Sequence, residues 1–180
     1  TFAKGVTSAY QPLGGVVIRG PLVKELYDSP MGSYVHGSTF GGHPVATAVA
    51  VANMSAMRDE GVLDHVLATE DSFAARLRAM GDAHPSVREV RGTGFFYAVE
   101  LCADAATDRD LSPTQEAALQ GGVLGGFVAE EKMTVRPDDR GYTGLTISPP
   151  LVADDAVIDD LVARVDRVAD RVDAWLAENE

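Results

Sequence analysis

The apolar residues change their spacing at the segment Gly81-Asp82-Ala83-His84-Pro85. Before this segment they recur every three or four residues, as in amphipathic helices. Directly beyond it they alternate with polar residues, as in half-buried strands. Glycine and proline interrupt both patterns. We therefore predict two domains, residues 1–82 and residues 83–180.

The first domain is predicted to be mainly helical. Its expected elements are one short buried strand and three helices, in this order: Val16–Ile18, Leu22–Tyr27, 44–61 and Val62–Met80. Pro21 and Pro44 support two of the helix starts, because proline is favoured in the first turn. Residues 28–42 are rich in Gly, Ser and Pro and are predicted to form a loop.

The second domain is predicted to combine strands and helices. The expected strands are Val87–Val90, Phe95–Leu101, Met133–Val135 and Gly144–Ile147. One helix should run from a capping box at Ser112 to about Lys132, weakened by two glycine pairs. Asp154 or Asp155 should cap the last helix. This order favours an α+β fold, with helices on one face of a mixed or antiparallel sheet.

Composition disfavours several classes of function. The formal net charge is −12 and the pI is near 4.6, which disfavours binding to nucleic acid or to an anionic membrane. A single cysteine, Cys102, excludes an intrachain disulfide framework and fits a reducing cytoplasm, which is the predicted location. No apolar run approaches the roughly 20 residues that span a bilayer. The histidines lack metal-ligand spacing, so no metal site is predicted.

Lys4 is the strongest candidate for chemistry. It lies between Ala3 and Gly5, and small neighbours allow a planar cofactor to approach the backbone. A lysine amine becomes a nucleophile when burial or neighbouring groups hold it partly neutral, and Schiff-base formation is its usual task. Taken alone, an isolated lysine is more often a solvated surface residue.

Four sequence blocks change this interpretation. The first contains Lys4 and reads Ala-Lys-Gly-Val-Thr-Ser-Ala-Tyr-Gln-Pro-Leu-Gly-Gly; the others are His36–Pro44, Arg91–Phe95 continuing to Val99–Leu101, and Ser148–Leu151. In this order, over nearly the whole chain, they closely resemble the motifs of class III aminotransferases, the ω-transaminase branch of fold type I.

The resemblance implies a fold and a cofactor. The parent enzyme would be α/β, with the PLP-dependent transferase fold type I, and this chain would be its C-terminal portion. Residues 1–82 would complete the large domain and residues 83–180 would form the α+β small domain. Lys4 would form a Schiff base with pyridoxal 5'-phosphate and move the proton of the substrate carbon.

Ser38 and Thr39 are the second candidates. Their block leads into the helix at Pro44, where backbone N–H groups and a hydroxyl can meet an anion. They could instead serve only as helix caps. In the family, the matching threonine binds the cofactor phosphate of the neighbouring subunit, with Ser38 expected to add a backbone contact. The resemblance therefore implies a homodimer with shared active sites.

Arg136 is the third candidate. A guanidinium binds a carboxylate in a bidentate manner, which suits an amino-acid or keto-acid substrate, and the resemblance assigns this task to the arginine before Pro137. Arg140 competes for the role, and either could be a surface residue of a polar turn. Thr146 stands where the ornithine branch has its carboxylate-binding arginine, which favours a pyruvate-type or amine-type enzyme. Ala9 replaces a more common glycine, which is a mild change to which we attach no interpretation.

The expected reaction moves an amino group from an ω-amino acid, a diamine or a primary amine to a keto acid such as pyruvate. Two alternatives stay open. A PLP-dependent aminomutase or racemase of the same family would share the lysine and threonine blocks. The isolated chain could also be a catalytically silent interaction module, because it lacks the aspartate and the stacking aromatic residue that hold the cofactor ring in the family.

Overall fold

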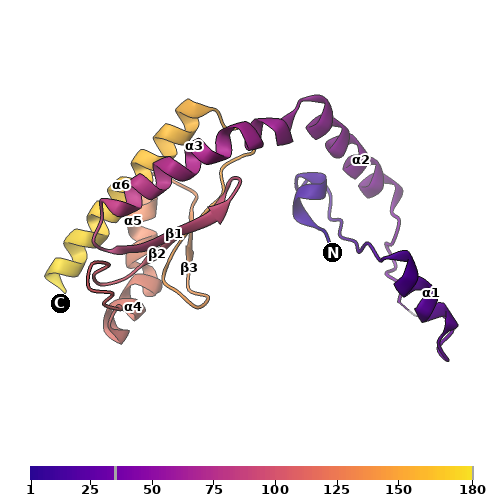
Figure 1. The fold of residues 1–180 in the computed structure, drawn as a ribbon, viewed down its shortest axis with the longest axis horizontal. Helices are drawn as coiled ribbons and strands as arrows, with labels where there is room; N and C mark the ends of the chain where they lie inside the picture. The colour runs from indigo at the N-terminus through magenta and orange to yellow at the C-terminus, as the bar shows by residue number, and fades with distance from the viewer. Residues whose placement is uncertain (35, 180) are drawn as a thin grey trace. The chain divides into compact units, whose positions relative to one another are not determined.

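The computed structural model describes residues 1–34 and 36–179. Contacts divide the chain into two compact units, Thr1–Gly61 and Val62–Glu180. Figure 1 labels most of their helices and strands along the chain. In the described part of the chain, no helix is both long enough and apolar enough to span a membrane.

The first unit is helical, as predicted. It contains a 3₁₀ turn and two α-helices: η1 (Lys4–Thr7), α1 (Gly20–Asp28) and α2 (Pro44–Asp59). Pro21 and Pro44 lie in the first turns of the two helices, which confirms the predicted starts. The described residues between Ser29 and Gly42 contain no helix or strand, as expected, and Val35 lies outside the described residues.

The predicted buried strand at Val16–Ile18 is wrong. The only pairing near it in the described chain is the bridge between Phe2 and Gly15, with two backbone hydrogen bonds of 2.9 Å. Val17 is 82% exposed. A strand forms only where a neighbouring backbone can accept and donate its hydrogen bonds, and that pairing stops at Gly15.

The second unit is α+β. Its strands are β1 (Val87–Thr93), β2 (Phe96–Leu101), β3 (Arg136–Asp138) and β4 (Gly144–Ile147), and its helical segments are α3 (Val62–Asp82), α4 (Pro113–Ala118), the π turn η2 (Leu119–Val123), α5 (Leu124–Glu130) and α6 (Asp155–Glu178). The four strands form one antiparallel sheet in the order β1-β2-β4-β3. The predicted fold class of this part is therefore confirmed.

Helices cover one face of the sheet. Along β2, the side chains of Tyr97, Val99 and Leu101 are buried, whereas Phe96 on the other face is 61% exposed. The buried face shares one core with residues of α3, η2, α5 and α6, and α3 and α6 run along the sheet in Figure 1. Each fully buried side chain of this size contributes about 1.5–3 kcal/mol.

The helix α3 belongs to this core. Phe73 and Leu77 of α3 are fully buried in it. Compact packing therefore divides the chain at Gly61, one helix earlier than the predicted boundary between residues 82 and 83. The periodicity shows where helical spacing ends, but it does not show which neighbour a helix buries its face against.

Two predicted elements of the second unit differ from the structure. The expected strand Met133–Val135 is wrong, because pairing begins one residue later, with Arg136 opposite Thr146. The helix predicted from Ser112 to Lys132 begins with the expected capping box but is interrupted at Gly122, where φ is +133°. Only glycine adopts that φ without strain. Asp154 caps α6, as predicted.

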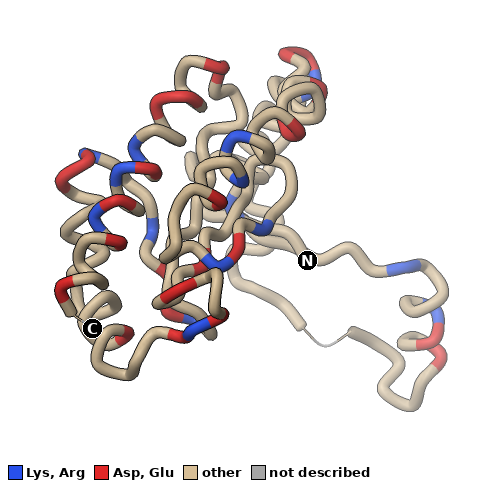
Figure 2. The backbone as a smooth tube through the Cα atoms, turned by 60° about the vertical axis from the view of Figure 1, so that its left-hand side comes forward, with Lys and Arg blue, Asp and Glu red and all other residues tan. Residues whose placement is uncertain are grey.

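Charged residues of both signs are interspersed along the described chain (Figure 2). On α6, Arg167 and Arg171 both reach Glu131, whose side chain is 9% exposed, at 2.7 and 3.0 Å. The Arg167 and Arg171 guanidinium groups, partly opposed by desolvation, hold the pKa of the Glu131 carboxyl below its usual range. These pairs fasten α6 to the end of α5.

His84 fastens the other end of the second unit. It lies between α3 and β1 and is 7% exposed. Its Nδ1 is 2.7 Å from Asp173 and its Nε2 is 3.0 Å from Asp166, both on α6. Burial alone would lower the pKa of His84, but the hydrogen bonds and charges of the two carboxylates outweigh it and raise the pKa.

This geometry predicts a pH-dependent stability. A raised pKa in the folded state stabilises the fold fully below pH 6.5, and this stabilisation is lost as the pH rises through the folded-state pKa. His84→Gln should lower the unfolding free energy at pH 6 by about 1–2 kcal/mol and remove this pH dependence. Urea unfolding, followed by the fluorescence of Trp175 on α6, measures both effects.

His36→Gln is the matched control, because His36 is an exposed histidine of the other unit. It should keep the wild-type pH dependence. An unchanged pH dependence in His84→Gln would show that the imidazole is not charged in the folded protein.

Candidate active site

The turn that carries Lys4 has a strained backbone. Lys4, Ser8 and Ala9 all have positive φ, at 51°, 46° and 63°. Such left-handed conformations cost on the order of 1 kcal/mol or more for residues with a Cβ. At Ala9, where the resemblance leads us to expect glycine more often, glycine would adopt this conformation without strain. Strain of this kind persists only where surrounding contacts enforce it.

The Lys4 amine is exposed at the surface of its unit. Within the described residues it forms no hydrogen bond or ion pair. The chain has two other lysines. Lys24 is paired with Asp28 on α1, and Lys132 lies in the second unit beside the groove described below. The Lys4 amine is thus free to react with a carbonyl group.

Asn53 of α2 holds the Lys4 turn. Its Nδ2 donates to the carbonyl oxygens of Gly5 at 3.0 Å and Val6 at 3.2 Å. Its Oδ1 accepts from Ser8 Oγ at 2.7 Å. The buried Thr7 adds a hydrogen bond from its Oγ1 to the carbonyl of Gln11 at 2.6 Å. Hydrogen bonds therefore hold the strained turn to the middle of α2.

Ser38 and Thr39 do not cap α2. The N-cap is His43, whose Nδ1 accepts a hydrogen bond from the amide of Ala46 at 3.4 Å. The side chains of Ser38 and Thr39 are exposed and form no hydrogen bond within the described residues, including none to Lys4. The alternative in which they serve only as caps is therefore wrong, and their hydroxyls are free to meet an anion near the helix N-terminus.

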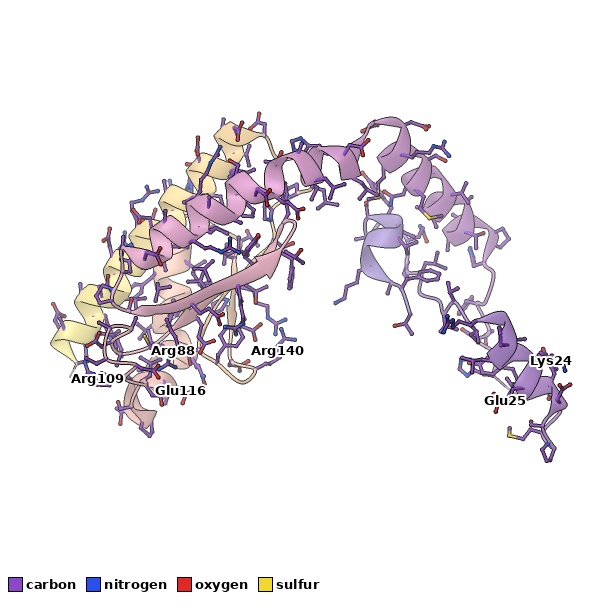
Figure 3. All side chains as sticks on the ribbon, in the orientation of Figure 1. Lys24, Glu25, Arg88, Arg109, Glu116 and Arg140 are labelled. Carbon is purple, nitrogen blue, oxygen red and sulfur yellow. The ribbon has the colours of Figure 1, made fainter. Side chains whose placement is uncertain are left out.

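The two candidate arginines differ in their partners. Arg136, at the start of β3, is exposed and forms no ion pair in the described part of the chain. Arg140, labelled in Figure 3, makes a bidentate pair with the buried Asp138 at 2.9 and 2.7 Å. Thr146 also donates to Asp138, at 2.9 Å. The Arg140 hydrogen bonds hold the pKa of the Asp138 carboxyl well below its usual range. Of these two arginines, only Arg136 is therefore available to a ligand.

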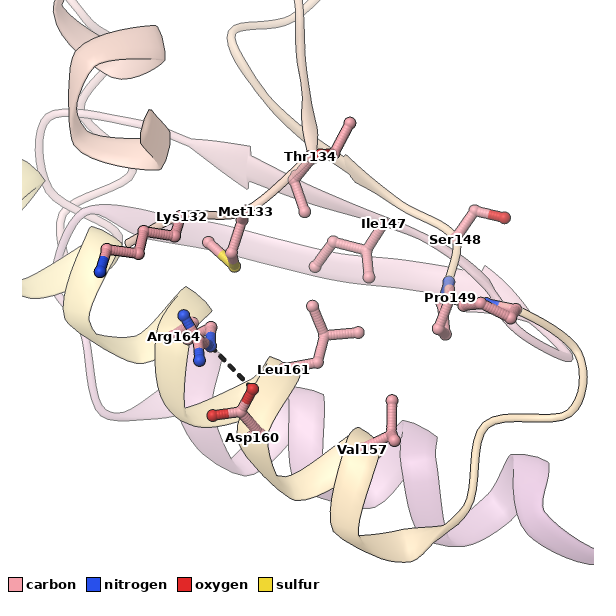
Figure 4. A pocket seen from close by; sticks show the side chains of 12 residues that line it. Lys132, Met133, Thr134, Ile147, Ser148, Pro149, Val157, Asp160, Leu161 and Arg164 are labelled. Carbon is pink, nitrogen blue, oxygen red and sulfur yellow. Dashed lines mark hydrogen bonds and ion pairs between the residues drawn. The ribbon is translucent and has the colours of Figure 1, made fainter. Parts of the chain in front are cut away.

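The four residues that precede Arg136 in the sequence, 132–135, line a groove. It has a volume of about 460 Å³ and runs between the chain around β4 and the first turns of α6 (Figure 4). Met133, Ile147 and Leu161 contribute apolar side chains, and Arg164 is paired with Asp160 at 2.7 Å at its rim. The groove belongs to the second unit alone.

Sequence reasoning missed Asn53 and Asp138. Asn53 is a polar residue within the largely apolar sequence of α2, but nothing in the sequence shows which loop its amide meets. Asp138 follows Pro137 in a polar turn, and nothing in the sequence shows which side chain its carboxylate meets. Among the described residues, no group of three or more His, Cys, Asp or Glu side chains is placed to hold a metal ion.

These residues fit an aldehyde cofactor that carries a phosphate. Lys4 supplies an unpaired primary amine, and the Ser38–Thr39 hydroxyls precede the positive end of a 16-residue helix. Each of these features lies in the unit formed by residues 1–61. Arg136 lies in the other unit.

The sequence is similar to known aminotransferases over almost the whole chain. The sequence model of the class III aminotransferase family matches residues 1–168. A probable aminotransferase of Mycobacterium tuberculosis is 37% identical over 85% of the chain, and the putrescine–pyruvate aminotransferase of Pseudomonas aeruginosa is 34% identical over 96%. The chain spans about a third of these relatives, 32% and 36% of their lengths.

Solved structures agree with the sequence comparison. An (S)-enantioselective ω-transaminase from Thermomicrobium roseum matches 95% of the chain with a TM-score of 0.82 and 32% identity, and the chain covers 36% of it. A transaminase from the marine bacterium Virgibacillus matches 97% of the chain with a TM-score of 0.86 and 31% identity, and the chain covers 39% of it. The family match, the sequence motifs and the fold of this chain together show that it belongs to the class III aminotransferases, whose cofactor is pyridoxal 5'-phosphate.

Proposed function

We propose that this chain carries the catalytic lysine of a transaminase that moves an amino group from an ω-amino acid, a diamine or a primary amine to a keto acid such as pyruvate. The observation that carries the proposal is the Lys4 amine, which is exposed and unpaired within the described residues, on a turn held in a strained conformation. Such a conformation is typical of functional sites.

Each candidate residue has one task in this proposal. When bound, pyridoxal 5'-phosphate supplies an aldehyde for the amino group and a sink for the electrons left on the substrate carbon. Lys4 Nζ binds the cofactor and then holds and returns the substrate proton as general base and acid. Thr39, with Ser38, binds the phosphate of the neighbouring subunit's cofactor. Arg136 binds the substrate carboxylate through its guanidinium.

The names of the relatives support the class of substrate. They include a putrescine–pyruvate, a taurine–pyruvate and a diaminobutyrate–2-oxoglutarate transaminase. Putrescine is a diamine. Pyruvate has one carboxylate, which matches the one unpaired guanidinium on the β3–β4 hairpin. We therefore favour pyruvate over a dicarboxylic acceptor.

The reaction itself can be tested with the full-length enzyme. Incubation with putrescine or another primary amine and pyruvate should form alanine, and Lys4→Ala should abolish this activity because no other group supplies the amine. Lys24→Ala, which removes a surface lysine paired with Asp28, should retain it. A mutase or racemase would form no alanine, and an active Lys4→Ala enzyme would refute the proposed role.

Arg136 and Arg140 can be distinguished by substitution. Arg136→Ala should raise KM for pyruvate about 10- to 100-fold, because a charge-assisted bidentate hydrogen bond is lost. Arg140→Ala should change KM much less, since its guanidinium is occupied by Asp138. Steady-state kinetics with pyruvate and with an uncharged aldehyde acceptor separates the two cases. A larger effect of Arg140→Ala on KM for pyruvate would reverse the assignment.

The shared active site can be tested by mixing subunits. Thr39→Ala should weaken cofactor binding, and Lys4→Ala should be inactive. If each site combines Lys4 of one protomer with Thr39 of the other, random mixing of the two variants leaves about a quarter of the sites intact in a twofold dimer. Activity should therefore rise on mixing. No rise after verified subunit exchange would place both residues in the same protomer's site or exclude the dimer.

A further inference from the structure

Within the described residues, Asn53 is the only side chain of α2 that forms hydrogen bonds to the Lys4 turn. Both amide hydrogens point to backbone carbonyls, of Gly5 and Val6, and the amide oxygen accepts from Ser8. All three partners lie within four residues of Lys4. The side chain thus uses its donors and its acceptor on one turn.

The contacted turn is the strained one. Lys4 and Ser8, at its two ends, have φ of 51° and 46°. The backbone hydrogen bonds of the turn are of ordinary to long length, at 3.4 Å from Val6 N to Ala3 O, 3.2 Å from Ser8 N to Gly5 O and 3.0 Å from Tyr10 N to Thr7 O. These bonds close the turn, but residues with a Cβ keep a positive φ only where surrounding contacts enforce it. The amide of Asn53 supplies such contacts from outside the turn.

The base of the same loop is closed by other residues. Phe2 and Gly15 form a two-bond bridge, and a Cβ at Gly15 would lie 2.4 Å from the Phe2 ring. This bridge fixes where the loop starts and ends. It leaves the direction of the Lys4 side chain to the contacts at the tip, which are those of Asn53 and Thr7.

We infer that Asn53 is a positioning residue, which aims the Lys4 amine by holding the backbone of its turn in the left-handed conformation. It does not touch the substrate or the cofactor. The inference deepens the proposed function, on which it rests, because positioning matters only if Lys4 performs the chemistry. A misplaced amine slows proton transfer, since catalysis depends steeply on the placement of the reacting groups.

The test uses the full-length enzyme and three variants, with Asn53→Gln added as a conservative variant in the kinetic measurement. Asn53→Ala removes all three hydrogen bonds to the turn, and Asn53→Asp keeps the acceptor for Ser8 but turns two attractive contacts into repulsions between oxygens. Ser55→Ala is the matched control, because it also places alanine on α2 but removes no hydrogen bond to the turn. Both alanine variants favour the helix itself.

The first measurement is hydrogen exchange of the apoenzyme, which does not depend on activity. Peptides that span residues 2–12 should exchange at least several-fold faster in both Asn53 variants, while peptides from α3 keep their wild-type rates. Ser55→Ala should match the wild type throughout. Wild-type exchange of the Lys4 turn in Asn53→Ala would overturn the inference.

The second measurement is kinetic. The rate of the half-reaction with the amine should fall about 10- to 100-fold in both Asn53 variants, with KM for the amine changed little, because the loss lies in the proton-transfer step. The pH midpoint of the bound cofactor's visible absorbance should also shift. Asn53→Gln, which retains an amide, should recover part of the rate. A purely structural role would lower the folded fraction without moving the pH midpoint.

The outcomes separate the inference from the proposed function. If Lys4→Ala is inactive but Asn53→Ala keeps the wild-type rate and pH midpoint, the inference is wrong and the function stands. If Lys4→Ala is active, the proposed function fails. Hydrogen exchange then still reports whether Asn53 holds the turn.

Discussion

One side-chain amide enforces the conformation on which the candidate active site depends. The Lys4 turn has positive φ at its two ends, a conformation that residues with a Cβ keep only where surrounding contacts enforce it. Asn53 gives that support from the middle of α2, about 14 Å along the helix axis from Pro44. The segment before Pro44 carries Ser38 and Thr39. The helix α2 therefore contacts the lysine turn through its middle, and the proposed phosphate-binding segment directly precedes its first residue.

The elements with strong local signals were predicted correctly. Pro44 marks the start of α2, and Asp154 caps α6, because these residues act on the backbone next to them. Predictions failed where a distant neighbour decides. Val16–Ile18 has strand-forming residues but no strand beside it beyond Gly15, and α3 joins the core of the second unit through Phe73 and Leu77. A single sequence contains no record of such neighbours.

The residues of the candidate site were predicted from motifs, but the hydrogen bonds that hold the Lys4 turn in place were not. Lys4, Thr39 and Arg136 were found through resemblance, and the structure leaves all three exposed without partners in the described residues. The hydrogen bonds of Asn53 join positions almost 50 residues apart in the sequence, and no local pattern indicates such a contact. The ion pair between Asp138 and Arg140 joins residues two positions apart, but a polar turn allows many such pairings. The sequence therefore does not show which pairing forms.

The central claim is that the ε-amine of Lys4 is the covalent attachment point of the cofactor. Borohydride reduction of the full-length enzyme with its cofactor, followed by proteolysis and mass spectrometry, tests it directly. The account predicts the added mass of the reduced cofactor on the peptide that contains Lys4. Attachment to Lys24, to Lys132 or to a lysine outside residues 1–180 would contradict it.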